Sequence, residues 1–394
     1  MKTPASLKVA IREWQMMIKS PTSRILIFWI PLIVFTLLAG IYSAGTLRKV
    51  PVAVLDQDHS NLSRTLITYL NASPDTKVTT YVNSEEQLKD FFLHHTEKAI
   101  YCFPHGLEKD VLKGKSTEVN VLTNSTNIIY GNILKRNAYR LIETVSGGVL
   151  IRKLTAQGLT PRQARHLALP IAVNAKPLFN PEYNYLYYLV PGLLTVLLQM
   201  IVFFMGARSI NTEYKAGNEE ELLETANHRI INIIIGKLLV YTSIGMVIAL
   251  FISILFAVFG IPYQNNIGAI LFLFFLFILA SGSLGMMLSA LVPEEIVALD
   301  IALFYNSSAF IFSGFTFPVM GMPLFDSLWA QFIPYTHFLG AFFKLSQMGT
   351  SLAFAQDELL ILAAFILVGF FTTYLALSLK MKNNIHSEII LTKA

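Results

Sequence analysis

Few residues in this sequence stand in the patterns that support chemistry. The string Gly114-Lys115-Ser116 matches the end of a phosphate-binding loop, but such a loop requires an earlier glycine at position 109, where the chain has Lys109. No nucleophile-elbow string is present either, although serine, histidine and aspartate are common in residues 47–182. We therefore expect no catalytic residue and no nucleotide site in this chain.

Two small groups of side chains carry atoms that bind metals. His94-His95 is one and Asp56-Gln-Asp-His59 is the other, but neither has ligands at helical i, i+4 spacing together with a third partner. Helix caps and solvated loops account for both groups. The single cysteine, Cys102, forms no intrachain disulfide and supplies no cysteine-rich cluster. We predict that this chain binds no metal and no cofactor.

The composition is that of a membrane protein. Of 394 residues, 54% are hydrophobic and only 14% are charged, and the mean hydropathy is +0.55. Soluble domains have about 25% charged residues. The net charge of +5, from 30 Lys+Arg against 25 Asp+Glu, is too small and too scattered to predict a nucleic-acid partner.

Six apolar blocks predict the membrane spans, since a helix of about twenty residues crosses roughly 30 Å of hydrocarbon. They are Ile25–Gly45, Tyr185–Ala207, Leu238–Phe259, Ile267–Val292, Ile301–Phe317 and Leu359–Leu379. The polar residues 47–182 after the first span are too many for a loop. We predict an α-helical polytopic membrane protein with six transmembrane helices, in residues 21–46 and 183–380, and an inserted α/β extracytoplasmic domain at 47–182.

Lysines and arginines near the span ends set the orientation. Five precede the first span and three follow the last: Lys2, Lys8, Arg12, Lys19, Arg24, Lys380, Lys382 and Lys393. We expect both termini in the cytoplasm, residues 381–394 as a cytoplasmic tail, and the inserted domain outside. The link after the fourth span weakens this model, because Glu294, Glu295 and Asp300 stand there without a lysine or arginine. The first span is not predicted to be a cleaved signal peptide, since its apolar core has full spanning length.

Residues 1–20 predict an amphipathic helix in the cytoplasmic interface. Four apolar residues share one helical face, with lysine and arginine elsewhere on the helix: Leu7, Ile11, Trp14 and Ile18. We expect Pro21 to end this helix. A plain basic extension that only sets topology is the alternative.

The inserted domain alternates β-rich and helical runs, which predicts a small α/β layer. The predicted strands are Pro51–Asp56, Lys77–Val82, Lys98–Phe103 and Glu118–Leu122, and the predicted helices are Asn61–Leu70, Ser84–His94 and Leu107–Leu112. We expect Ser60 or Asn61 to cap the first helix, and Ser84 with Gln87 to form a capping box on the second. A long helical pattern from Ile128 to about Leu169 is expected to break at Gly147-Gly148 and again at Gly158–Pro161.

The spans contain few ionisable residues. Lys237 and Asp300 lie at span edges, from which side chains reach the interface, so ion coupling through mid-span charges is not predicted. The run Ser281–Gly285 is expected to permit close helix packing. Interior polar groups are neutral: Gln199, Ser281, Ser283, Asn306, Ser307 and Ser308. Such a lining favours an apolar or amphiphilic cargo.

The predicted cytoplasmic link from Glu213 to Arg229 is the most specific segment. We expect Asn218 to cap a short helix and Glu221 to close the capping box. Acidic residues in the first turn, with His228 and Arg229 at the far end, suit the helix dipole. A simple surface helix does not explain the apolar strip formed by Leu222, Leu223 and Ala226. We interpret this strip as a docking surface for another protein.

This link resembles that of the membrane subunits of type-2 ABC transporters, in particular bacterial export permeases with a large outer domain. Their link reads Glu-x-Glu-x-Gly-Thr-x-Glu-x-Leu-Leu-x-Thr-Pro, with Gly-Lys at the next span. The matching residues here are Glu213, Gly217, Glu220, Leu222, Leu223, Thr225, Gly236 and Lys237, and the departures are Lys215, Asn218 and Ala226. The resemblance implies the type-2 ABC permease fold and a coupling helix within residues 213–229. The expected coupling residues are Glu213, Gly217, Asn218, Glu220, Leu222, Leu223, Thr225 and Arg229.

A second resemblance to this family follows the fifth span, in Ser313–Pro323 and Ile333–His337. Prolines break the helix there, and the apolar stretch between them is too short to span. The resemblance implies an outer re-entrant segment, residues 318–356, with a gate at Gly314, Pro318, Pro323 and Pro334. A surface loop packed on the outer domain is the alternative.

The resemblance implies a permease subunit of an ATP-driven exporter that moves an apolar or amphiphilic substrate, a drug-like molecule or a lipid, across a bacterial inner membrane. The implied partners are two cytoplasmic ATPase subunits, which hold ATP and magnesium, a second permease copy or sister permease, and the bilayer. A periplasmic adaptor is a further candidate. A membrane-anchored receptor or assembly protein acting through the outer domain is the alternative, and an ion-coupled transporter is a third class.

Overall fold

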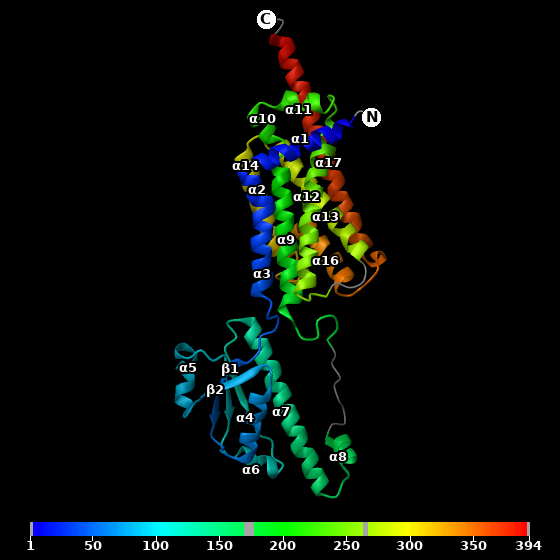
Figure 1. Cartoon of the computed structure of the whole chain (residues 1–394). Coiled ribbons are helices and arrows are strands. Elements are labelled where there is room, and N and C mark those ends of the chain that lie inside the picture. Colours follow the sequence, from blue (N-terminus) through cyan, green and yellow to red (C-terminus); the bar gives the residue numbers. More distant parts are fainter. Residues whose placement is uncertain (1–2, 169–176, 263–266, 392–394) are drawn as a thin grey trace. The chain divides into compact units, whose positions relative to one another are not determined.

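The computed structural model describes residues 3–168, 177–262 and 267–391. Its contacts divide the chain into two compact units (Figure 1): a helical unit, Met1–Gly45 with Leu178–Ala394, and an α/β unit, Thr46–Pro177. Each unit has its own buried core. The division falls close to the predicted domain bounds of 47 and 182.

Six helices within the described residues are long and apolar enough to cross a membrane, and they follow the predicted order. They are Pro21–Ile41, Tyr185–Ala207 (α9), Ile230–Val258 (α12), Ile267–Leu291 (α13), Glu295–Phe312 (α14) and Leu352–Lys382. The first combines α2 (Pro21–Arg24), two π-helical turns (Ile25–Trp29 and Pro31–Phe35) and α3 (Thr36–Ile41). The last combines a 3₁₀ turn (Leu352–Ala355) with α17 (Gln356–Leu391).

Four of these helices start earlier than the predicted apolar blocks, at Pro21, Ile230, Glu295 and Leu352. Helix α12 begins at Ile230 instead of Leu238, because the helix continues through Lys237, whose charge is buried and paired inside the protein. Helix α14 begins at Glu295 instead of Ile301 and ends at Phe312. Its end is fixed by Gly314, whose φ of +88° is open to glycine and strained for other residues.

The shorter helices of this unit lie toward the ends of the bundle. Figure 1 shows α1 (Ala5–Lys19), α10 (Asn211–Ala216) and α11 (Glu219–Thr225) together at one end, with the last turns of α17. We call this the α1 end. Helix α16 (Pro334–Ser346) lies toward the opposite end, which we call the α16 end. It is preceded by a 3₁₀ turn (Val319–Gly321) and α15 (Leu324–Gln331).

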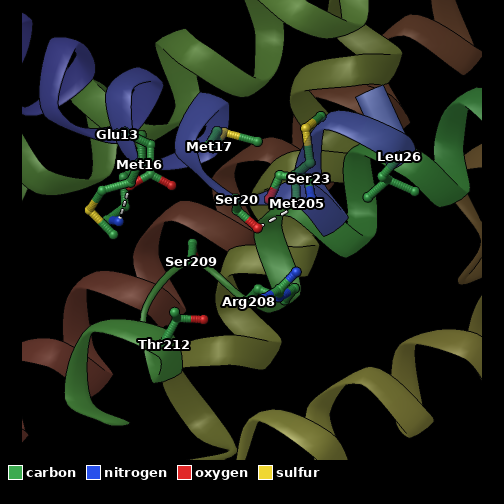
Figure 2. Close-up of a pocket in the computed structure, with 11 residues that line it drawn as sticks. Glu13, Met16, Met17, Ser20, Ser23, Leu26, Met205, Arg208, Ser209 and Thr212 are labelled. Carbon is green, nitrogen blue, oxygen red and sulfur yellow. Dashed lines mark hydrogen bonds and ion pairs between the residues drawn. The ribbon is translucent and has the colours of Figure 1, made fainter. Parts of the chain in front are cut away.

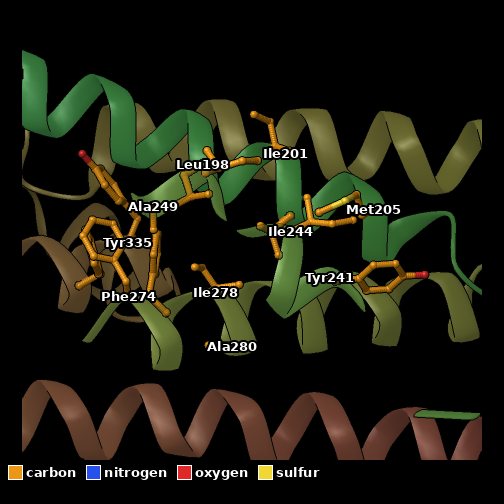
Figure 3. Close-up of a cluster of buried hydrophobic side chains, with 14 of the residues drawn as sticks. Leu198, Ile201, Met205, Tyr241, Ile244, Ala249, Phe274, Ile278, Ala280 and Tyr335 are labelled. Atoms are coloured by element: carbon orange, nitrogen blue, oxygen red, sulfur yellow. The ribbon is translucent and has the colours of Figure 1, made fainter. Parts of the chain in front are cut away.

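Helices α9, α12 and α13 form the centre of the helical unit. Figure 3 shows their apolar side chains meeting between the helices, Leu198 and Ile201 from α9, Ile244 from α12 and Ile278 from α13. Glycines bring the backbones together, since a Cβ on Gly285 would lie 2.3 Å from the carbonyl oxygen of Phe203. The predicted close packing at Ser281–Gly285 is therefore confirmed.

The α/β unit is a four-stranded sheet with helices on both faces. Among its described residues the strand order is β2-β1-β3-β4, with β1 parallel to β2 and β3, and β4 antiparallel to β3. The strands are Val50–Asp56, Thr76–Tyr81, Ala99–Phe103 and Asn120–Thr123. The helices are α4 (Asn61–Ala72), α5 (Leu88–His94), α6 (Leu107–Leu112), α7 (Ile128–Ala156) and α8 (Pro161–Ala168), with a 3₁₀ turn at Glu85–Gln87.

Alternating side chains of the strands form a core on each face. Val52, Val54 and Tyr101 pack with α4 and α7, whereas Ala53 and Ile100 pack with α5. All four predicted strands and the α/β layering are thus confirmed.

Two local predictions in this unit are wrong. Ser84 makes no capping bond, although Ser60 caps α4 through a reciprocal bond with Ser63. Helix α7 runs unbroken through Gly147-Gly148, because two glycines cost a helix only about 1 kcal/mol each and α7 has 29 residues. The predicted break at Gly158 is confirmed, whereas Leu169 lies outside the described residues.

The loop aspartates of this unit act as caps. Asp58 accepts hydrogen bonds from the backbone N–H groups of Gly106 (2.8 Å) and Glu108 (3.0 Å) at the start of α6. Asp56 accepts from the backbone N–H groups of Asp58 and His59. The string Gly114-Lys115-Ser116 follows α6 and leads into β4 instead of opening a helix, unlike a phosphate-binding loop.

Candidate functional site

The predicted coupling segment forms two helices instead of one. Gly217 adopts a left-handed conformation with φ +68°, which ends α10, and α11 begins two residues later at Glu219. The backbone N–H of Asn218 donates to the carbonyl of Glu213 (3.0 Å) and completes this turn. The glycine of the motif is therefore a helix terminator between two short helices.

The predicted capping box on α11 is not formed. Asn218 makes no side-chain bond to the helix, and Glu221 instead accepts a hydrogen bond from Nε of Arg12 at 3.0 Å. The carboxylate thus joins α11 to α1. Thr225 donates its hydroxyl to the carbonyl of Glu221, one turn back along the helix.

The apolar strip of α11 faces the chain's own core, which corrects its interpretation as an exposed docking surface. Leu222 and Ala226 are buried among the apolar side chains of the helical unit, and Leu223 is partly buried. A periodic apolar strip shows only that a face is covered, not what covers it. The face of α11 left in solvent carries Glu220 and Glu224, one turn apart, and is acidic.

Glu213, the first glutamate of the link, is buried instead in a network of charged side chains beside α10. Glu213 accepts two hydrogen bonds from the guanidinium of Arg12, at 2.7 and 3.1 Å, and one from Nζ of Lys237 at 3.0 Å. Lys237 also bonds Glu13, which accepts a further bond from the hydroxyl of Tyr241. We call these five residues the charge cluster.

The charge cluster joins three segments that are far apart in the sequence. Arg12 and Glu13 come from α1, Glu213 from α10, and Lys237 and Tyr241 from α12. The two cations balance two carboxylates, which is the condition under which charges are tolerated away from water. The prediction that Lys237 reaches the interface from a span edge is wrong, because its side chain is almost fully buried and doubly paired.

The charges of Glu213 and Arg12 stabilise each other. Burial alone would raise the pKa of Glu213, but the positive charges of Lys237 and Arg12 outweigh burial and hold that pKa below its ordinary value. Burial would lower the pKa of Arg12, but its hydrogen bonds to Glu213 and Glu221 raise it above its ordinary value. Both groups are therefore ionised at neutral pH.

Gly236 allows α1 to reach the cluster. A Cβ at this position would lie 2.6 Å from the carbonyl oxygen of Ser6 and 2.7 Å from Cβ of Val9. Helix α1 therefore packs directly on the backbone of α12. The Gly-Lys pair of the motif has two linked roles here, a close helix contact at Gly236 and an ion pair at Lys237.

The predicted interfacial face of α1 is left uncovered by the chain. Leu7, Ile11, Trp14 and Ile18 are each exposed on the surface of the helical unit. The opposite face carries buried Val9 and the paired Arg12 and Glu13. Helix α1 ends at Lys19, and Pro21 starts the next helix, as predicted.

A small cavity of about 170 Å³ lies beside the charge cluster, between α1, α2 and the link that follows α9. Figure 2 shows Met16, Met17 and Met205 around it, with the hydroxyls of Ser209 and Thr212 on the opposite wall. Methionine side chains are flexible and adapt to irregular gaps. The cavity therefore leaves room for α1 to shift against α9 and α10.

A second ion pair resolves the difficulty with the acidic link after α13. Glu295 accepts hydrogen bonds from Arg208 (2.8 Å) and Lys215 (3.1 Å), which belong to the link between α9 and α12. Glu295 therefore lies at the same end of the bundle as those cations. Lys215, which stands where the motif has a glutamate, thus makes an ion pair with Glu295.

The predicted gate residues terminate or start helices after α14. Gly314 ends α14, Pro318 and Pro323 precede short helices, and Pro334 is the first residue of α16. The ring of Phe315 beside them packs on Gly192 of α9, where a Cβ would lie 2.0 Å from Cε2 of that ring. Phe315 also stacks on Tyr188, with ring centroids 5.4 Å apart, and Tyr188 donates its hydroxyl to the carbonyl of Phe315.

Sequence reasoning missed several of these residues. Arg12 was predicted only to be a charge that sets topology on the polar side of the N-terminal helix, and Glu13, Gly192 and Phe315 received no role. The position of Lys237 beside a glycine in an apolar run was the sequence signal that its charge needs an acidic partner. The acidic partner itself was not predictable, because Glu13 and Lys237 are more than 200 positions apart in the sequence.

Comparisons with known proteins agree with this architecture. The sequence pattern of the family described as "ABC-2 family transporter protein" matches residues 21–380. The chain is also 27% identical over 185 residues to the "Probable multidrug ABC transporter permease YbhS" of Escherichia coli strain K12, and equally to that of strain O157:H7. The similarity covers 45% of this chain and 48% of each relative, so the chain spans about half the length of the curated relatives it matches.

Proposed function

The chain belongs to the ABC-2 family of transporter proteins, and from this premise we propose that it is the permease of an exporter. Its substrate is an apolar or amphiphilic molecule, which it moves out across the inner membrane of a bacterium. Membership in the family makes the chain a multi-pass membrane protein and implies an ATPase partner. Direction, substrate class and membrane are our proposal.

The charge cluster is the observation that carries the proposal. An ATPase that drives transport must move the spans through contacts at one end of the bundle. Glu213 of the short helix α10 is fixed to Lys237 of the span α12 and to Arg12 of α1. A displacement of α10 and α11 is therefore passed to α12 through ion pairs, since breaking a buried pair costs about 3–5 kcal/mol.

The solvent-facing side of α11 supplies the contact for the ATPase subunit. Glu220 and Glu224 are exposed there, and Arg229 is exposed just beyond. We propose that an ATPase subunit with a basic surface docks on the two glutamates. Two such subunits, which bind ATP and magnesium, would act on a pair of permeases, since six spans alone enclose no regulated path. A periplasmic adaptor remains a further candidate partner.

The orientation follows from cations at the α1 end. Arg208, Lys215 and Arg229 lie in the link between α9 and α12, and such positive charge favours the cytoplasm. The pairing of Glu295 with Arg208 supports the same assignment for the next link. We propose that this end is cytoplasmic and that the α/β unit is extracytoplasmic.

The substrate class is supported by the apolar interior and by the relatives. Polar groups deep in the spans are neutral, as in the hydrogen bond of 3.1 Å between Gln199 and Asn306. The two Escherichia coli relatives are named as probable multidrug permeases. We propose a drug-like or lipid substrate instead of an ion or a sugar.

Co-purification tests the proposal. The chain is expressed with the ATPase subunit encoded beside it, purified through a tag on the permease alone, and assayed for vanadate-sensitive ATP hydrolysis in lipid. We expect the ATPase to co-purify and to be active, and its substrate-stimulated activity to accompany efflux. A permease that purifies alone from every such expression contradicts the proposal.

A charge reversal locates the contact. Glu220→Lys with Glu224→Lys alters only exposed side chains, so the permease should fold normally but lose the ATPase. Glu143→Lys, at an exposed position of α7 in the α/β unit, is the matched control and should retain it. Leu222→Asp is unsuitable for this purpose, because Leu222 is buried and its replacement would disturb the fold.

A further inference from the structure

The α/β unit contains a groove that its fold does not require. Its volume is about 440 Å³, within the range of about 300–1,000 Å³ typical of small-molecule sites. Three helices line it: Asn61, Leu62, Thr65 and Tyr69 from α4, Glu108, Val111 and Leu112 from α6, and Thr144, Val145, Gly148, Val149, Arg152 and Lys153 from α7. We call it the α4–α6–α7 groove.

The walls of the groove are apolar although they face solvent. Tyr69 is 52% exposed and Leu112 is 67% exposed, and partly buried Leu62, Val111 and Val145 lie between them and the core. Exposed apolar surface in a concave region marks a binding site more often than scattered exposure does. The walls therefore suit an alkyl chain.

Gly148 keeps the floor of the groove open. It lies on the groove-facing side of α7, one turn after Thr144 and one turn before Arg152, and a Cβ added there would meet nothing within 4 Å. Glycine inside a helix costs about 1 kcal/mol relative to alanine, and no close packing compensates that cost at this position. A larger side chain at position 148 would therefore occupy space in the groove.

Charge selects the head group of the ligand. Arg152 and Lys153 line the groove against one carboxylate, Glu108, and no hydrogen bond or ion pair of either cation is found among the described residues. The ammonium of Lys153 lies over Gly114, 3.1 Å from where a Cβ would stand, so Lys153 reaches across to the loop after α6. Lys113 and Lys115 flank this glycine and add positive charge.

We propose that the α4–α6–α7 groove binds a single-chain anionic amphiphile, with its alkyl chain over Gly148 and its anionic head group at Arg152 and Lys153. A guanidinium and an ammonium form strong charge-assisted hydrogen bonds with a carboxylate or phosphate. This binding site is independent of the proposed direction of transport and of the ATPase contact, because it lies wholly within the α/β unit.

Photolabelling of the full-length chain in lipid nanodiscs tests the site. The probe is a twelve-carbon fatty acid with a diazirine at the end of its chain, and labelled peptides are located by mass spectrometry. Label in α4, α6 or α7 that competes with unlabelled dodecanoate is expected. An alkyl probe of equal length with a trimethylammonium head group should label these helices about tenfold less, since loss of one charged contact lowers affinity about that much.

Two matched pairs of variants make the test specific. Gly148→Leu fills the groove and should reduce labelling about tenfold, whereas the adjacent Gly147→Leu, which also meets open space but does not line the groove, should leave it unchanged. Arg152→Gln should weaken labelling similarly, whereas Arg140→Gln, at another exposed arginine of α7, should not. Thermal unfolding checks that all four variants fold.

Three results would overturn the proposal. They are no labelling of the three helices, equal labelling by the anionic and cationic probes, and equal labelling of wild type and a folded Gly148→Leu variant. None of these results depends on ATP hydrolysis, so failure here is distinguishable from failure of the proposed export function.

Discussion

Oε1 of Glu213 lies 3.0 Å from Nζ of Lys237, and each side chain is only 1% exposed. A carboxylate and an ammonium are thus paired with each other and kept from water at the end of a membrane span. The same carboxylate also binds Arg12 of α1. One residue of the link between two spans thus fixes the position of two other helices.

Removal of Lys237 should be strongly destabilising. Lys237→Met keeps the length and apolar stem of the side chain but leaves Glu13 without a cation, because Arg12 bonds only Glu213 and Glu221 in the described structure. Breaking a buried pair in this way costs about 3–5 kcal/mol. We expect a lower midpoint of thermal unfolding in detergent and a loss of coupled ATP hydrolysis.

The control for this variant is Lys8→Met on the exposed side of α1. Surface substitutions of this type change stability by about 0.5 kcal/mol or less. Equal unfolding midpoints for the two variants would show that the charge cluster does not hold the helices together.

Acid should release α1 from α10. The pKa of Glu213 is held below its ordinary value by Lys237 and Arg12 against the opposing effect of burial. A carboxylate with a depressed pKa contributes stability above its unfolded pKa of about 4.3, and the contribution falls as pH drops through the folded pKa. Hydrogen exchange of α1 amides, corrected for the intrinsic rate, should thus be constant from pH 7 to about pH 5 and accelerate below about pH 4.

Glu213→Gln serves as the comparison, since its amide does not titrate in this range. It should weaken the attachment of α1 at neutral pH and remove the acid dependence. Release of α1 near pH 6 in wild type would instead assign the effect to a different group.

A methyl group at Gly236 should separate α1 from α12. In Gly236→Ala the new Cβ meets the backbone carbonyl of Ser6 at 2.6 Å, so the backbone of α1 must move. Overpacking of this kind costs about 1–3 kcal/mol. Hydrogen exchange of α1 amides at neutral pH should therefore be faster than in wild type. Gly268→Ala in α13, where a Cβ meets nothing within 4 Å, should exchange as wild type does.

The sequence predicted the spans because hydropathy is a property of each segment alone. Six helices and the order of elements in the α/β unit follow from such local patterns. The link motif also directed attention to Glu213, Gly236 and Lys237 through family resemblance. What these residues bind could not be predicted, because Arg12 and Glu13 come from a distant segment and fit an amphipathic surface helix equally well.

Leu222 is a second residue whose partners could not be predicted from the sequence. Its place in an apolar strip predicted a covered face, and the face is covered, but by the chain's own core instead of a partner. Gly192 carried no signal at all, since a glycine beside a proline in a span has many uses, and only the position of Phe315 in space gives it one. Local periodicity thus identifies faces, whereas three-dimensional packing identifies their partners.

The contact of Phe315 with Gly192 should keep the α16 end of the bundle closed. In Gly192→Ala the added Cβ would lie 2.0 Å from the ring of Phe315, so the ring must leave α9. In proteoliposomes without ATP, leakage of a trapped dye should become about tenfold faster, which corresponds to a free-energy barrier to leakage lowered by roughly 1.4 kcal/mol. Gly40→Ala, which meets open space, is the control and should not leak. Because leucine is smaller than phenylalanine, Gly192→Ala combined with Phe315→Leu should restore closure. A tight Gly192→Ala variant, or a double variant that leaks more than the single one, would show that this contact is not a gate.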